Sequence, residues 1–190
     1  MHKFRYRSIL VAVATAATML IAPTSATAAG EGYVDADPGG QNDWGDEGPF
    51  GSGSYPTADA VGLWQTVLYF DGRLDADEID CVFGPRTIGA TRGWNNTVFG
   101  AGGQASYDNA MRAGLAWADD YLTPVGTWAK NSEYELMKYK SPATTWPSRS
   151  DNIRILRHKS DHGLYRFMDS ATGNSVAARY TSGTSASRCG

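Results

Sequence analysis

Two cysteines constrain the fold of this chain more than any other feature. They stand at Cys81 and Cys189, and the 190-residue sequence has no others. In an exported chain such a pair usually forms a disulfide. This bond would join the penultimate residue to the middle of the chain, and the chain-entropy model values such a long loop at about 4–5 kcal/mol. We expect the two halves to form one structural unit. A free catalytic thiol at Cys81 is the alternative.

The N-terminal segment predicts export. Lys and Arg side chains in the first seven residues precede an apolar run over 9–22, and small residues follow at 26–29. This order is typical of a secretory signal peptide. At about 1.5 Å per residue the run is shorter than the ~30 Å core of a bilayer, so a membrane anchor is the less favoured reading. We expect residues 1–29 to be removed and the mature protein to be secreted, extracellular or cell-wall associated, with no membrane contact.

Charge divides the mature chain into two parts. Removing Lys3, Arg5 and Arg7 takes the net charge from −3 to −6, and such an acidic protein is a poor candidate for binding nucleic acid. Acidic residues dominate before Lys138 and basic residues after it. Either the two parts attract one another, or the basic part faces an anionic polymer of the cell envelope.

The segment over 30–56 is an acidic leader. It is rich in Gly, Pro and Asp, has no Lys or Arg, and shows neither the helical nor the strand period. We predict a disordered linker here. Docking of its isolated Trp44 and Phe50 on the folded body is the alternative.

Helical and strand patterns follow in that order. Apolar residues at spacings of three and four predict a helix from Thr57 to Asp71, a second from Arg86 to about Trp94, and a third over 106–121. Short apolar runs then predict strands over 152–157, 163–168 and 175–180. The segment 134–139 suits either a strand or the end of a helix.

A turn joins the first two helices, and its residues have physical roles. Asp80 can accept backbone N–H groups, Gly84 can adopt a positive φ, and Pro85 suits a first helical position. Thr87 can help to satisfy the start of the second helix. Phe83 would fill the space between the two helices.

This segment resembles the peptidoglycan-binding-like domain, a small three-helix module that binds the cell wall. The likeness is carried over 61–94 by Trp64-Gln65, then Asp80, Phe83-Gly84-Pro85, Thr87 and Trp94, and Thr127-Trp128 is similar to the closing pair of that family. The chain departs from the family at Cys81, where the family has Gly, at Asn95, where it has Gln, and in the length of 95–127.

The three-helix module that the resemblance implies, together with the strand patterns and the cysteine pair, predicts an α+β fold. A three-helix module over 57–130 would be followed by a small antiparallel β meander in a basic C-terminal extension over 131–190, with one disulfide stapling the two. The resemblance also implies that peptidoglycan, or another cell-envelope polymer, binds in a shallow groove near the turn over 80–87. The candidate binding residues are Gln65, Asp80, Arg86, Thr87, Trp94 and Asn95. The residues expected to build the motif are Trp64, Phe83, Gly84, Pro85 and Trp128.

A catalytic function is the less favoured interpretation. His158 and His162, with Asp161, have a zinc-like spacing, but they fall in a predicted strand and hairpin rather than on a helix. No nucleophile motif occurs. The glutamates that a glycosidase might use sit in polar runs: Glu78, Glu133 and Glu135. We therefore expect a monomeric, non-catalytic wall-binding protein with no metal or cofactor. A protein-interaction, inhibitor or accessory role and a wall hydrolase are the alternatives.

Overall fold

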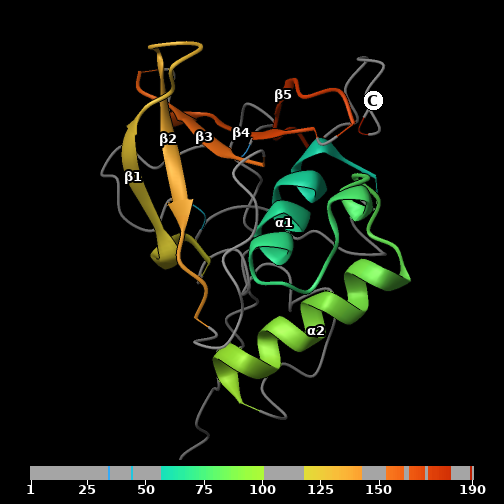
Figure 1. Ribbon diagram of the computed structural model, residues 1–190. Coiled ribbons are helices and arrows are strands. Elements are labelled where there is room, and N and C mark those ends of the chain that lie inside the picture. Colours follow the sequence, from blue (N-terminus) through green and yellow to red (C-terminus); the bar gives the residue numbers. More distant parts are fainter. Residues whose placement is uncertain are drawn as a thin grey trace, which may run out of the picture.

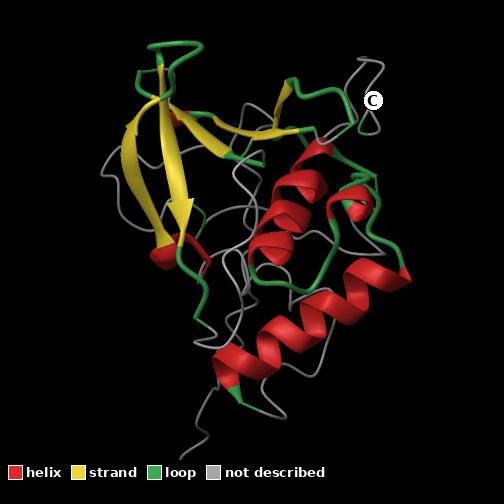
Figure 2. Cartoon of the chain, in the orientation of Figure 1, coloured by secondary structure: helices red, strands yellow, loops and turns green. Residues whose placement is uncertain are grey.

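The computed structural model describes residues 57–100, 118–142, 153–160, 163–169 and 171–180, together with Val34, Trp44 and Cys189. The elements are α1 (Asp59–Phe70), η1 (Ala76–Glu78), α2 (Pro85–Phe99), η2 (Asp119–Tyr121), β1 (Leu122–Thr127), β2 (Tyr134–Tyr139), β3 (Ile155–His158), β4 (Tyr165–Met168) and β5 (Ser175–Ala177). Helix α1 lies between the sheet and α2 (Figure 1). The cartoon coloured by secondary structure separates the strands from the helices (Figure 2).

Helix α1 is the centre of the molecule. Every residue from Asp59 to Tyr69 is buried, as expected of a helix covered on all sides. Gly62 lets its backbone approach two other elements, because a Cβ at this position would collide with Cys81 Sγ and with the ring of Phe167 on β4. The helix therefore touches both the disulfide and the sheet at one residue.

Helix α2 is amphipathic and covers the far side of α1. It begins with Pro85 at its first position and ends at Gly100, whose φ of 82° stops it. Its buried residues recur at spacings of three and four: Thr87, Ala90, Thr91, Trp94 and Asn95. The helix runs to Phe99, five residues beyond the predicted end.

The five strands form one antiparallel sheet in the order β1-β2-β3-β4-β5. A row of core side chains crosses it in register, because Met137 pairs with Ile155, Ile155 with Phe167, and Phe167 with Val176. All four side chains belong to the same hydrophobic core as α1. The sheet and the helices are thus one folded unit.

The predicted architecture is wrong. The described residues hold two α-helices and a five-stranded sheet, not a three-helix module followed by a small meander. The sheet already starts at Leu122, and Thr127, predicted as part of a helical closing pair, ends β1 opposite Glu135. The third helix predicted over 106–121 lies outside the described residues up to 117, and 119–121 form η2. The strand predictions after Lys140 are confirmed by β3, β4 and β5, and 134–139 form β2.

The disulfide is confirmed. Cys81 and Cys189 are bonded, their Cα atoms lie 4.9 Å apart, and 108 positions separate them along the sequence. Both cysteines take part in this disulfide, which excludes a free thiol at Cys81. Such a bond is consistent with an extracellular location.

Two residues of the acidic leader belong to the core. Val34 donates its N–H to Ala178 O at 2.8 Å and accepts from Tyr165 N at 2.9 Å, while Ala178 N donates to Tyr165 O at 3.0 Å. In a regular antiparallel pair, Tyr165 N would donate directly to Ala178 O. Here Val34 lies between these two groups, accepting from the first and donating to the second. Trp44 is fully buried and packs edge-on against Tyr165, with ring centroids 5.1 Å apart. Phe50 lies outside the described residues.

Candidate functional site

Gln65 holds the turn between α1 and α2 from inside. Its amide nitrogen donates to Asp80 Oδ1 at 2.7 Å, to Thr87 Oγ1 at 2.9 Å and to Val82 O at 3.1 Å. Its carbonyl oxygen accepts from the backbone N–H groups of Asp80, at 3.0 Å, and Cys81, at 2.8 Å. Because Gln65 is fully buried, its amide fixes the turn and does not face solvent.

The tryptophans of the motif form a buried pair between the helices. Trp64 donates its indole N–H to Thr91 Oγ1 at 2.9 Å, and its ring packs edge-on against Trp94 at 5.4 Å between centroids. Trp94 in turn donates to the phenol oxygen of Tyr139 on β2 at 2.9 Å. These contacts tie α1, α2 and the sheet together.

Most of the candidate binding residues are therefore interior. Four of the six have side chains almost wholly inaccessible: Gln65, Thr87, Trp94 and Asn95. Of the residues expected to build the motif, Trp64 and Phe83 are in the core, while Gly84 and Pro85 start α2. Trp128 lies in the β1–β2 hairpin, packed edge-on against Tyr134 and away from the turn.

Asp80 and Arg86 remain at the surface of the turn. Asp80 is half-buried, and its Oδ1 also accepts from Val82 N at 2.9 Å. The Arg86 side chain is 77% exposed and contacts Glu78 Oε1 through Nε at 2.6 Å and Nη2 at 2.5 Å. Val82 between them is 42% exposed, one of two large apolar side chains so exposed in the described part of the chain.

An open groove of about 400 Å³ runs beside Arg86. It separates the loop after α1 from the first two turns of α2. Its lining residues are Gly72, Arg73, Pro85, Arg86, Gly89 and Ala90. Two guanidinium groups and the start of a long helix surround it, so the groove favours anionic groups, carboxylates above all.

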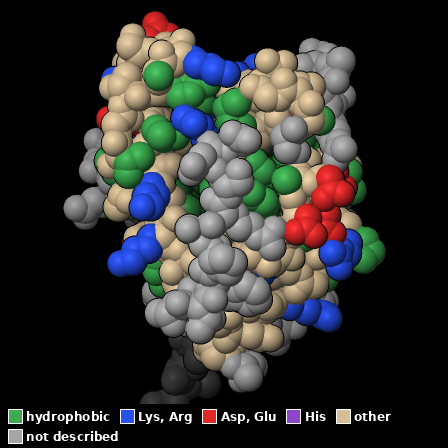
Figure 3. Space-filling model, viewed as in Figure 1, with side chains coloured by type: hydrophobic (Ala, Val, Ile, Leu, Met, Phe, Trp, Pro, Cys, Tyr) green, Lys and Arg blue, Asp and Glu red, His purple; other side chains and the backbone are tan. Residues whose placement is uncertain are grey.

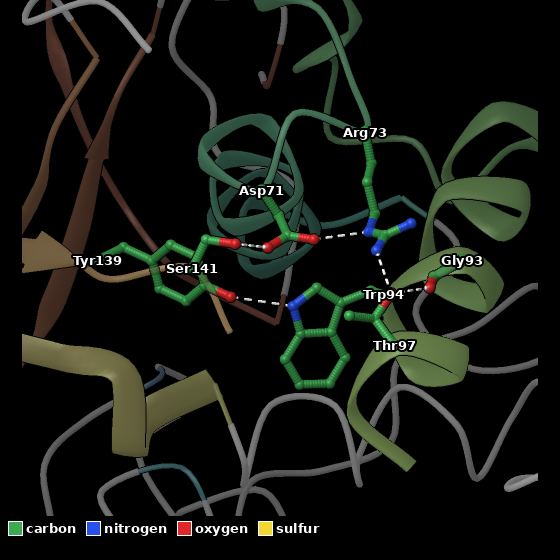
Figure 4. A network of polar contacts seen from close by, with 7 residues as sticks. All are labelled: Asp71, Arg73, Gly93, Trp94, Thr97, Tyr139 and Ser141. Carbon is green, nitrogen blue, oxygen red and sulfur yellow. Dashed lines mark hydrogen bonds and ion pairs between the residues drawn. The ribbon is translucent and has the colours of Figure 1, made fainter. Parts of the chain in front are cut away.

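Arg73 is fixed by a buried network (Figure 4). Its Nε donates to Asp71 Oδ2 at 2.6 Å and its Nη2 to Thr97 Oγ1 at 2.6 Å. The other oxygen of Asp71 accepts from the hydroxyl of Ser141, just after β2. The network therefore joins the end of α1, the last turn of α2 and the segment after β2.

Burial changes the acid–base properties of this network. It raises the pKa of the Asp71 carboxyl, and the hydrogen bonds from Ser141 and Arg73 oppose that change. Burial and the nearby charge of Asp71 also raise the pKa of Tyr139 far above its ordinary range, so the phenol stays protonated. Sequence reasoning missed this network because Asp71-Gly72 marked only a helix end, and nothing in the sequence linked Ser141 to it.

The described metal and hydrolase candidates take part in ion pairs. Among the residues that the structure describes, no three His, Cys, Asp or Glu side chains are placed to hold a metal ion. His158 lies 3.9 Å from Glu133, while Asp161 and His162 fall outside the described ranges. Glu78 pairs with Arg86 and Glu135 with Arg157.

Comparisons of the chain with protein-family models, with curated protein sequences and with solved structures find no match. In the described part of the chain, the helices are too short or too polar to span a bilayer.

Proposed function

We propose that this protein is exported and binds cell-wall peptidoglycan without cleaving it, through the groove beside the α1–α2 turn. The observation that carries the proposal is the open groove with Arg73 and Arg86 at its edge. The resemblance of 61–94 to the peptidoglycan-binding-like domain and the signal-like N-terminus support the same reading. The binding surface differs from the residue set that the motif suggested, because most of that set is buried.

The chemistry of the groove suits the peptide stems of the wall. Stem peptides carry free carboxylates, and a guanidinium group binds a carboxylate through paired N–H donors. Arg86 is the accessible one, and its contacts with Glu78 engage one carboxylate oxygen only. Since a guanidinium group has five N–H donors, Arg86 can hold Glu78 and a ligand together.

The rigidity of the turn favours binding. Gln65 fixes the backbone at Asp80 and Cys81, and the disulfide adds a second restraint at Cys81. A ligand that meets a preformed surface loses less free energy to ordering the protein. The buried motif residues would thus act by positioning the groove.

A protein-interaction role for the same turn is the second candidate. It is favoured by Val82, an exposed apolar side chain next to a charged pair, which is a common arrangement in protein interfaces. This reading places a protein, not a glycan, against the turn.

Sedimentation with insoluble purified peptidoglycan tests the proposal. The protein spanning 30–190 should pellet with the wall, and Arg86→Ala should weaken binding about tenfold, the loss expected when a charge-assisted contact is removed. Arg92→Ala is the matched control, because Arg92 is exposed on the same helix but does not line the groove. Equal binding of peptidoglycan by the Arg86→Ala and Arg92→Ala variants would exclude the groove as the binding site. A protein that stays in the supernatant would favour the interaction role.

A further inference from the structure

A cluster of aromatic and basic side chains lies at the hairpin end of the sheet, far from the α1–α2 turn. Tyr134 is its centre. His158 packs edge-on against the Tyr134 ring at 4.8 Å between centroids, Trp128 does so at 6.3 Å, and Arg166 Cζ lies 5.7 Å from the ring centroid. We call these four residues the Tyr134 cluster.

The Tyr134 cluster is outside the hydrophobic core. Its four side chains are each partly buried, and none belongs to the core shared by α1 and the sheet. Tyr134 lies opposite His158 in the pairing of β2 with β3, so the two rings project from the same face of the sheet. Aromatic rings held in place at a surface offer flat apolar faces and edges to a ligand.

Basic side chains lie near the cluster, together with Glu133, which is 3.9 Å from His158. Arg166 is anchored to Ser175, through Nε to Oγ at 3.2 Å and through Nη2 to the backbone oxygen at 2.7 Å. Lys159 is exposed at the end of β3 and donates to Thr127 Oγ1 at 2.8 Å. Lys130 is exposed in the β1–β2 hairpin. The space-filling view shows Lys and Arg side chains along the β1–β2 side, with a few Asp and Glu side chains at the top and edge of that side, and a larger group of Asp and Glu side chains beside η1 (Figure 3).

Within the described ranges, Arg166, Lys159 and Lys130 form no ion pair with a carboxylate. Between described residues, the ion pairs of the sheet are Arg157–Glu135 and His158–Glu133, and both partners belong to the sheet. Lys138 likewise forms no ion pair within the described ranges. The basic surface therefore remains able to attract an anionic partner.

We infer that the Tyr134 cluster is a second binding surface, and that it takes an acidic polysaccharide. Sugar rings would stack on Trp128 and Tyr134 through their C–H faces, and the acidic groups of the polymer would meet Arg166 and Lys159. A lipid surface is a poorer match, because the rings pack against one another and do not protrude.

Affinity electrophoresis in gels containing a soluble polysaccharide tests this inference. Heparin serves as the acidic polysaccharide, dextran as a neutral one, and polyphosphate as an anion without sugar. Heparin should retard the protein and dextran should not. Trp128→Ala should weaken heparin binding about tenfold while leaving polyphosphate binding unchanged, and Trp128→Tyr should restore most of the heparin affinity.

The lysines supply the matched pair of variants. Lys159→Ala should weaken both heparin and polyphosphate binding about threefold. Lys140→Ala removes the same charge just beyond the opposite end of β2, about 20 Å away at ~3.3 Å per residue, and should change neither. Arg86→Ala should leave heparin binding intact, which separates this surface from the groove.

Three results would overturn the inference. Heparin binding that is insensitive to Trp128→Ala in a folded variant would remove the stacking role. Equal losses in Lys159→Ala and Lys140→Ala would show unspecific attraction to net charge. Binding to phosphatidylglycerol vesicles that is stronger than binding to heparin would assign the surface to a membrane instead.

Discussion

The side-chain oxygen of Gln65 accepts a hydrogen bond from the backbone N–H of Cys81 at 2.8 Å. Cys81 has a φ of 59°, the only positive φ of a non-glycine residue in the described ranges. This conformation costs an ordinary residue about 1–2 kcal/mol more than it costs glycine. Here Gln65 and the disulfide together hold a cysteine in a backbone conformation that suits glycine.

Replacing Gln65 should destabilise the fold strongly. Gln65→Leu removes the partner of the backbone N–H groups of Asp80 and Cys81, and a buried polar group left unsatisfied costs about 1–3 kcal/mol. We expect a loss of about 3 kcal/mol or more in the free energy of unfolding, measured with urea. A loss below about 1 kcal/mol would contradict the role of Gln65 in fixing the turn.

Gly62 and Gly89 should respond in opposite ways to the same change. Gly62→Ala places a methyl group against Cys81 Sγ and Phe167, so we expect a loss of about 1–3 kcal/mol from overpacking. On α2, a methyl group at Gly89 would have no atom within 4 Å. Gly89→Ala should therefore raise the free energy of unfolding by up to about 1 kcal/mol, because alanine has the higher helix propensity. Thermal unfolding of both variants checks the pair, and equal shifts would refute the close approach at Gly62.

The sequence predicted the two described α-helices and the last three strands, but not that β1 belongs to the sheet. Apolar spacing located α1, and Pro85 marked the start of α2. Strand β1 was not predicted because it contains Pro124 and Gly126, two residues that normally argue against a strand. The pairing of β1 with β2 tolerates them through a register shift between these two positions.

The site was harder to predict because its parts are distant in sequence. The motif identified Gln65 and Trp94, yet a motif cannot tell a side chain that builds a turn from one that binds a ligand. Asp71 meets Ser141 and Trp94 meets Tyr139 across 70 and 45 positions, respectively. No local sequence pattern predicts contacts between residues so far apart in the chain.

The conformation at Cys81 can be tested without the disulfide. We expect the double variant Cys81→Ala with Cys189→Ala to lose about 4–5 kcal/mol in the free energy of unfolding relative to the oxidised protein. This is the stabilisation that the chain-entropy model assigns to a disulfide closing so long a loop. Cys81→Gly with Cys189→Ala should be more stable than that variant by about 1 kcal/mol, since glycine adopts a positive φ readily. Urea unfolding of the two variants measures the difference. A less stable glycine variant would show that the backbone at Cys81 relaxes once the bond is absent.

Asp71 should make stability fall as the pH rises from acid. The pKa of its carboxyl is raised in the folded protein above the unfolded value of 3.8, chiefly because of burial. In the interval between these two pKa values the folded state binds more protons than the unfolded state, so the free energy of unfolding decreases with increasing pH. Above the folded pKa the decrease is complete and the penalty stays constant.

Comparison with Asp71→Asn isolates this contribution. The difference in unfolding free energy, wild type minus variant, should fall as the pH is raised above about 3.8, because the asparagine does not titrate. Urea midpoints measured at closely spaced pH values give this difference, with other carboxyl groups cancelling between the two proteins. A difference that rises with pH would mean that the ion pair with Arg73 outweighs the cost of burying the Asp71 charge. The folded-state pKa would then be lowered rather than raised, and the network would stabilise the protein most when Asp71 is ionised.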